Sequence, residues 1–149
     1  MSCDAPTEPL IRALQDANAW PHPVGDVAVI ETHISWVLLT GTFAYKIKKP
    51  VDFGFVDFTT LERRQFFCEE ELRLNRRLAP NLYLAVVPIT GTVDCAVVEG
   101  SGTLIEFAVK MRQFSQEMLL SRLIACDNLA AEHIDSLAEE VADFHSCIE

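Results

Sequence analysis

The sequence predicts an α+β fold in which one antiparallel sheet carries helices on one side. Two observations lead to this prediction. Segments rich in β-branched and aromatic residues form two groups of three, and one long helical segment separates the groups. Strands and helices do not alternate one by one, as they would in a parallel α/β sheet, so neighbouring strands are expected to pair antiparallel.

The first group of elements is a short helix and three strands. The helix is expected over residues 8–19, because the Trp20-Pro21-His22-Pro23 segment after it cannot continue a helix. The strands are expected over residues 26–30, 34–39 and 43–49. Thr40-Gly41-Thr42 has the composition of a hairpin turn between the last two strands, and Pro50 ends the third.

The second group begins with a long helix over residues 60–78. Thr59 and Glu62 have the spacing of a capping box at its start, and Ala79-Pro80-Asn81 ends it. Three strands are expected next, over residues 83–89, 95–98 and 104–114. Two helices complete the sequence, over residues 116–124 and 131–148.

Composition excludes several classes of function. The chain has 149 residues, half of them apolar, and a net charge of −10, which is an ordinary globular composition. Nucleic-acid binding would need a basic patch, which this charge argues against. No apolar run approaches the roughly 20 residues of a membrane helix, and the N-terminus lacks the features of a secretory signal. We therefore expect a cytoplasmic protein with neither a nucleic-acid nor a membrane partner.

The cysteines indicate free thiols and no metal site. They are Cys3, Cys68, Cys95, Cys126 and Cys147. No Cys-x-x-Cys pair is present, and no histidine stands at metal-ligand spacing from any of them. This pattern fits a reducing compartment.

A lysine late in the third strand begins the most informative pattern. Phe43-Ala44-Tyr45-Lys46 has the spacing of the kinase strand Val-Ala-Ile-Lys, whose lysine binds the ATP phosphates and is held by a helix glutamate. A flexible ammonium needs such a carboxylate, on a rigid helix, to keep it at the phosphates. Lys48 is the alternative to Lys46, because residues 46 and 48 share one face of the strand, whereas Lys49 faces the other way.

Three consecutive glutamates on the long helix, Glu69 to Glu71, are candidates for the partner. We choose Glu71, which lies nine residues before Pro80, at the helix-end distance usual for the kinase glutamate. Leu74 and Leu78 are spaced for one face of the helix. A lysine-rich strand followed by an acidic helix is also a common surface arrangement. The order of elements favours the functional interpretation, because one helix between the third and fourth strands is the layout of a kinase N-terminal lobe.

Three longer stretches resemble one bacterial family. They are residues 31–37 (Glu-Thr-His-Ile-Ser-Trp-Val), 44–55 (Ala-Tyr-Lys-Ile-Lys-Lys-Pro-Val-Asp-Phe-Gly-Phe) and 70–76 (Glu-Glu-Leu-Arg-Leu-Asn-Arg). In them the chain resembles the aminoglycoside-phosphotransferase-like proteins, which are often fused to a second, P-loop kinase domain. The resemblance extends over roughly residues 20–149.

The resemblance implies a fold and an activity. Residues 1–114 would be a protein-kinase-like N-terminal lobe, an antiparallel sheet of about five strands with one helix, preceded by a helical extension. Residues 115–149 would be the first helices of an incomplete second lobe. The intact protein would transfer the γ-phosphoryl group of ATP to a hydroxyl of a small molecule, whose identity the sequence does not give.

The resemblance also implies site residues. Lys46 would bind the phosphates of ATP, with Glu71 as its partner. Met111 and Gln113, where the last strand ends, would contact adenine through backbone groups. No Gly-x-Gly-x-x-Gly loop is present, so the loop between the first two strands would cover the phosphates with its N–H groups and the Ser35 hydroxyl.

The catalytic loop is missing from this sequence. Asp52-Phe53-Gly54 spells the magnesium motif of protein kinases, but that motif belongs after the catalytic loop, so we interpret it as a turn. In related proteins the final helix leads into a His-Gly-Asp loop, followed by an asparagine and an aspartate that bind magnesium. This sequence stops at Glu149 before any of them. Magnesium and turnover are therefore expected only in the full-length protein, and this chain alone is expected to be inactive.

The final helix carries an apolar stripe at spacings of three and four residues, Ile134, Leu137, Val141, Phe144 and Ile148. We expect the isolated chain to be marginally stable or to cover this stripe by self-association.

Two other functions fit the same residues. The chain could be a non-catalytic nucleotide-binding or regulatory module that keeps Lys46 and Glu71. It could also be a plain α+β domain in which these residues are surface charges. Binding of ATP separates both nucleotide-binding functions from the third.

Overall fold

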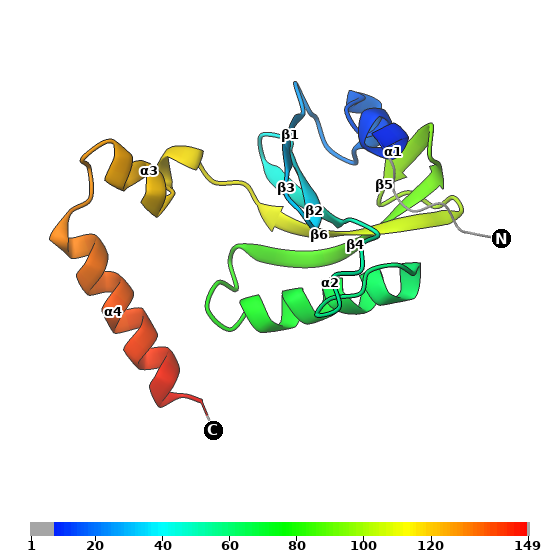
Figure 1. The fold of residues 1–149 in the computed structure, drawn as a ribbon. Helices are drawn as coiled ribbons and strands as arrows, with labels where there is room; N and C mark the ends of the chain where they lie inside the picture. The colour runs from blue at the N-terminus through cyan, green and yellow to red at the C-terminus, as the bar shows by residue number, and fades with distance from the viewer. Residues whose placement is uncertain (1–7, 149) are drawn as a thin grey trace. The chain divides into compact units, whose positions relative to one another are not determined.

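The computed structural model describes residues 8–148 of the chain. It divides into two compact units, of which the first ends at Gln113 and the second begins at Phe114. The units are described separately below (Figure 1).

The first unit is built on an antiparallel sheet, which confirms the predicted α+β class. The six strands lie in the order β1-β2-β3-β6-β4-β5, and every pairing is antiparallel. Their bounds are Ala28–Glu31 (β1), Ser35–Leu39 (β2), Phe43–Lys48 (β3), Tyr83–Thr92 (β4), Cys95–Val98 (β5) and Leu104–Arg112 (β6). The sheet therefore has one strand more than the five or so that the resemblance implies.

The apolar core lies on one face of this sheet, under the N-terminal helices. Leu10 and Leu14 pack there against Trp20 and Tyr45, and all four side chains are buried. The ring of Trp20 lies 4.7 Å from that of Tyr45, and its Nε1 donates to the carbonyl of Leu14. Consecutive residues of a strand point to opposite faces, so Lys46 points away from this core.

The predicted helix over residues 8–19 is two shorter helices, α1 (Glu8–Ala13) and η1 (Ala17–Ala19). The break occurs at Asp16, whose carboxylate accepts the N–H of Asn18 and so caps a new 3₁₀ turn.

The long helix, α2 (Leu61–Asn75), lies between β3 and β4 in the sequence, as predicted. It packs on the face of the sheet opposite α1, because it meets Lys46 while α1 meets Tyr45 (Figure 1). The expectation that the helices share one side of the sheet is therefore wrong.

Both ends of α2 differ from the prediction. Its N-cap is Thr60, whose hydroxyl accepts the N–H of Arg63, so the capping box predicted from Thr59 does not form. Leu74 and Leu78 are 46% and 47% exposed, so they do not form a buried face. The helix ends before Arg76, whose guanidinium donates to two carbonyls at the start of β4.

Asp52-Phe53-Gly54 forms a turn, as predicted. Asp52 and Asp57 pair as an isolated antiparallel bridge, and the Asp52 carboxylate accepts the N–H of Gly54. Gly54 has φ of +78°, a conformation that glycine adopts without strain.

The second unit contains η2 (Gln116–Met118), α3 (Leu120–Ala125) and α4 (Ala131–Ser146). The single helix predicted over residues 116–124 is divided at Leu119, which is extended with ψ of 134°. Along the predicted stripe, Ile134, Leu137, Val141 and Ile148 are each between 38% and 52% exposed. Across residues 8–148, no helix has the length and apolar character needed to cross a membrane.

Candidate functional site

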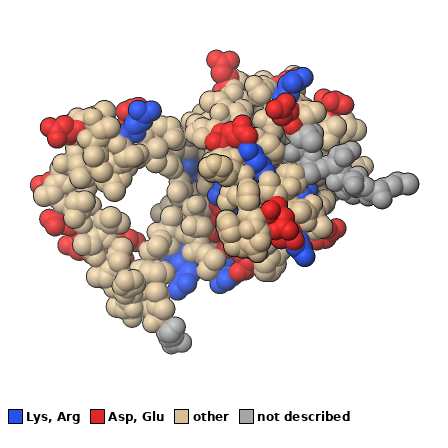
Figure 2. Space-filling view, in the orientation of Figure 1, with Lys and Arg blue, Asp and Glu red and all other residues tan. Residues whose placement is uncertain are grey.

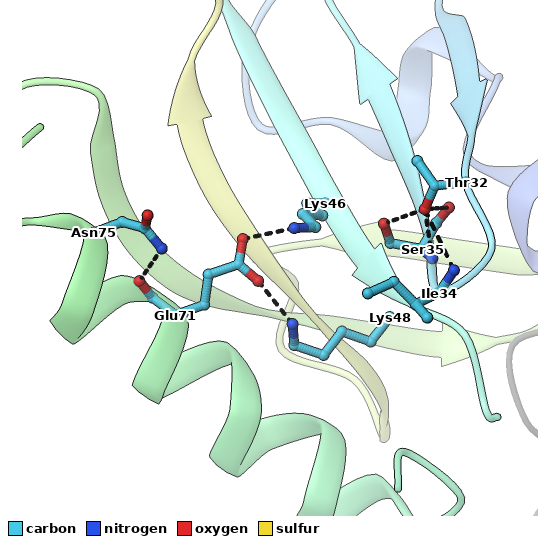
Figure 3. Close-up of polar contacts among 7 residues, drawn as sticks. All are labelled: Thr32, Ile34, Ser35, Lys46, Lys48, Glu71 and Asn75. Atoms are coloured by element: carbon cyan, nitrogen blue, oxygen red, sulfur yellow. Dashed lines mark hydrogen bonds and ion pairs between the residues drawn. The ribbon is translucent and has the colours of Figure 1, made fainter. Parts of the chain in front are cut away.

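The candidate site lies on the face of the sheet that α2 covers. Lys46 and Lys48 reach it from β3, and Glu71 reaches it from α2 (Figure 3). The Nζ of Lys46 lies 2.8 Å from Oε1 of Glu71, and the Nζ of Lys48 lies 2.7 Å from Oε2. One carboxylate therefore binds two ammonium groups, one through each oxygen.

The two lysines are not equivalent. The side chain of Lys48 is 6% exposed and also lies over the ring of Phe58, with Nζ 5.0 Å from the ring centroid. The side chain of Lys46 is 25% exposed. Lys48 is thus enclosed by its partners, while the ammonium of Lys46 has room to meet a further group. This asymmetry favours Lys46 over Lys48 as the lysine that a ligand could reach.

Glu71 is held in its ionised form. Burial alone would raise the pKa of Glu71, but the charge of Lys48 and the hydrogen bond and charge of Lys46 outweigh it and hold the pKa below its ordinary value. Asn75, one helical turn further, donates its side-chain amide to the backbone carbonyl of Glu71 (Figure 3). The carboxylate is therefore a fixed negative charge on a rigid element.

Tyr83, at the start of β4, is a further member of the site that sequence reasoning missed. Its pKa is raised by burial and by the charge of Glu71, and lowered to a smaller extent by Lys46. Tyr83 is paired across the sheet with Met111. Only the strand register brings this residue to the site, and the sequence around it carries no motif.

Met111 and Gln113 lie at the end of β6 and just beyond it. Met111 is paired with Ala44, and Val109 with Lys46, so Met111 shares the face of the sheet on which Lys46 lies. Gln113 is engaged by the β2–β3 turn, because its N–H donates to the carbonyl of Thr42 and its side-chain oxygen accepts the N–H of Gly41. The backbone N–H of Gln113, which the resemblance assigns to adenine, is therefore already bonded to Thr42 within the first unit.

Ser35, at the start of β2, is paired across the strands with Lys48 of β3. It is 1% exposed, and its hydroxyl lies 2.9 Å from the hydroxyl of Thr32, which also accepts the N–H groups of Ile34 and Ser35 (Figure 3). The loop thus satisfies these groups internally. The Ser35 hydroxyl is therefore engaged within the loop, and its role in covering the phosphates stays a prediction.

A second buried ion pair joins α2 to the sheet. Arg64 donates through Nε to Oε2 of Glu106 on β6, at 2.8 Å, and their side chains are 4% and 0% exposed. Burial raises the pKa of Glu106 to about 7, although the nearby charge of Arg64 acts in the opposite direction. The two residues are 42 positions apart in the sequence, and neither belongs to a recognisable motif.

Metal binding finds no support in the part of the chain that the structure describes, where no cluster of three or more His, Cys, Asp or Glu side chains could hold an ion. Figure 2 shows Lys and Arg side chains dispersed among Asp and Glu on the visible face, with no basic patch. The charged groups of the candidate site are the ammonium groups of Lys46 and Lys48 and the carboxylate of Glu71.

Comparisons with known proteins identify relatives but no family. No protein-family model matches the chain, and no solved structure matches it. Uncharacterized proteins of Mycobacterium bovis and Mycobacterium tuberculosis are 35% identical to it over 133 residues, which cover 87% of this chain and 25% of each relative. The chain therefore spans about a quarter of the length of the curated relatives it matches.

Proposed function

We propose that this chain is the ATP-binding part of an aminoglycoside-phosphotransferase-like small-molecule kinase, with a protein-kinase-like N-terminal lobe. The observation that carries the proposal is the contact of 2.8 Å between Lys46 on a central strand and Glu71 on the helix that crosses it. The position of α2 between the third and fourth strands and the motif resemblance support the same conclusion.

Lys46 is the group that binds the phosphates in this proposal. Its side chain is partly exposed, and its ammonium has three N–H donors, of which one reaches Glu71. The remaining donors and the positive charge suit an anionic phosphate oxygen. Glu71, which Lys48 also binds, holds the ammonium in place, so that binding a nucleotide costs little ordering of the Lys46 side chain.

The phosphoryl transfer itself belongs to the intact protein. Magnesium and a catalytic aspartate are the groups that such a reaction needs, and this chain supplies neither in the proposal. The curated relatives are about four times as long as the matched region, which leaves room in them for a catalytic aspartate and magnesium ligands. The acceptor is a small-molecule hydroxyl of unspecified identity.

Calorimetric titration of the full 149-residue chain with ATP tests the proposal. We expect binding that weakens about tenfold or more in Lys46→Ala, because a charge-assisted hydrogen bond to phosphate is lost. Lys110→Met is the matched control. It removes a lysine from β6 that pairs with Glu99 and lies over the rings of Phe43 and Tyr45, on the other face of the sheet.

Two results would contradict the proposal: no binding of ATP, or equal weakening in Lys46→Ala and Lys110→Met. A second experiment extends the proposal to the whole enzyme. A longer relative should phosphorylate a hydroxyl compound with ATP, and a variant at the position equivalent to Lys46 should not. Binding without turnover in that longer protein would instead favour a regulatory nucleotide-binding module.

A further inference from the structure

Charged side chains hold much of the contact between α2 and the sheet. The fully buried residues of this helix are Arg64 and Cys68, and the side chain of Glu71 is 13% exposed. Residues 64, 68 and 71 follow one face of a helix. Phe66 and Leu74, in contrast, are 56% and 46% exposed. The face of α2 that meets the sheet is therefore charged at both ends, with the Cys68 thiol and the half-buried ring of Phe67, which packs on Phe58, between them.

Each end of this face is fixed by an ion pair to a different strand. Glu71 binds Lys46 and Lys48 of β3. Arg64 binds Glu106 of β6, and the other oxygen of Glu106 accepts the N–H of Phe107. The guanidinium of Arg64 also donates to the carbonyl of Phe58, 2.8 Å away, which joins the helix to the segment that precedes it.

We propose that the Arg64–Glu106 pair sets the position of α2 on the sheet, and through it the position of the Lys46 ammonium. Arg64 and Glu106 are then positioning residues for the nucleotide site, and this inference rests on the function proposed above. Arg64 and Glu71 are seven positions apart, which corresponds to about 10 Å along the axis of a rigid helix. A slide of α2 along its axis, or a rotation about that axis, that separates Glu71 from Lys46 also separates Arg64 from Glu106.

The physical basis is the directionality of the buried contacts. Apolar side chains can repack after a small slide at low cost, whereas a buried guanidinium and carboxylate lose their partners at once. Cys68 lies between the two pairs, and burial raises its pKa to about 12, so its thiol stays neutral and adds no competing charge. These directional contacts therefore favour a single position of α2 relative to β3 and β6.

The test replaces the pair without burying a lone charge. Arg64→Met with Glu106→Leu keeps most of the side-chain volume, and Arg64→Gln with Glu106→Gln is the second variant if that replacement does not fold. Lys110→Met is again the control, since it removes a different ion pair from β6. Circular dichroism first establishes that each full-length variant is folded.

Two measurements then follow. The first is the NMR signals of the Lys46 and Lys48 ammonium groups without nucleotide, assigned with Lys46→Ala. We expect both signals to move in the double replacement and to stay unchanged in Lys110→Met. The second is ATP affinity, which we expect to fall about threefold to thirtyfold in the double replacement. In a protein that already carries Lys46→Ala, the double replacement should not weaken ATP binding further, because it acts through Lys46.

The outcomes separate this inference from the function on which it rests. Unchanged lysine signals in a folded variant would overturn the positioning role, whatever the affinity for ATP. A loss of affinity that simply adds to that of Lys46→Ala would overturn it as well. Moved lysine signals in a protein that binds no ATP would keep the positioning role and overturn the proposed function.

Discussion

Lys46 and Lys48 bind the two oxygens of a single carboxylate, that of Glu71, at 2.8 and 2.7 Å. Two cations on one anion leave a net positive charge at the site. The more exposed of the two, Lys46, is the one placed to share that charge with a ligand. The pairing therefore combines a structural contact, made by Lys48, with a proposed binding contact, made by Lys46.

This division of roles predicts that replacing Lys48 and replacing Lys46 lower the free energy of unfolding by different amounts. Lys48→Met should lower the free energy of unfolding by about 1.5–3 kcal/mol, because it removes a buried charge-assisted hydrogen bond. Lys46→Met should cost less, since water screens part of its interaction with Glu71. Urea denaturation at neutral pH measures both values. Equal costs, or a larger cost for Lys46→Met, would contradict the assignment.

Glu71 predicts a pH dependence of stability. Its pKa lies below the ordinary value of 4.5 in the folded protein, because the two lysines outweigh the effect of burial. A carboxyl with a lowered pKa contributes stability above its unfolded pKa, and that contribution is lost as the pH falls through the folded value.

The comparison of wild type with Glu71→Gln measures this contribution. We expect the difference in unfolding free energy to be full at neutral pH and to shrink as the pH falls below 4.5. Urea denaturation at a series of pH values provides the measurement. A difference that stays constant across the acidic range would show that the charge of Glu71 is not what stabilises the fold.

The cysteines predict a pattern of chemical reactivity. Cys68 is buried with a pKa raised to about 12, whereas Cys95, Cys126 and Cys147 are exposed. Among these four cysteines, iodoacetamide should modify Cys95, Cys126 and Cys147 in the native protein and Cys68 only after denaturation, because the thiolate is the reactive form; Cys3 lies outside the described residues. Peptide mass spectrometry follows each site. Native labelling of Cys68 at the rate of Cys95 would indicate that α2 opens readily from the sheet.

The stripe on α4 predicts self-association of the isolated chain. Burying an apolar side chain of this size stabilises an assembly by about 1.5–3 kcal/mol, and Leu137 and Val141 are 52% and 38% exposed. Sedimentation velocity should show concentration-dependent association that Leu137→Gln with Val141→Gln abolishes. Ser136→Gln, outside the stripe on the same helix, is the control. A monomer at all concentrations that binds no hydrophobic dye would contradict this prediction.

Much of the first unit could be predicted because its signals are local. Strand β5 occurs at Cys95–Val98 as predicted, and β3 differs by one residue, since alternation and turn residues mark both. The helix over residues 8–19 was predicted less well, because the Asp16 side chain competes for a backbone N–H and starts a new turn. The choice of Glu71 among three glutamates also agrees with the contact to Lys46.

The contacts across the sheet could not be predicted. Arg64 with Glu106 and Tyr83 with Met111 depend on strand register and on how α2 lies, and no local pattern contains either. Leu74 is exposed although its spacing predicts a buried face, because helical spacing indicates a face without saying whether that face is buried. The buried face of α2 is marked instead by Arg64 and Cys68, residue types that a search for apolar stripes passes over.

The central claim is that the ammonium of Lys46 meets the phosphates of a nucleotide, and covalent labelling tests it most directly. An acyl-phosphate derivative of ATP transfers its acyl group to a lysine amine beside the bound phosphates, and peptide mass spectrometry identifies that lysine. We predict acylation of Lys46 that excess ATP suppresses, with Lys48 and Lys110 labelled no faster than in denatured protein. Labelling that excess ATP does not suppress, or that falls on Lys48 in place of Lys46, would contradict the account.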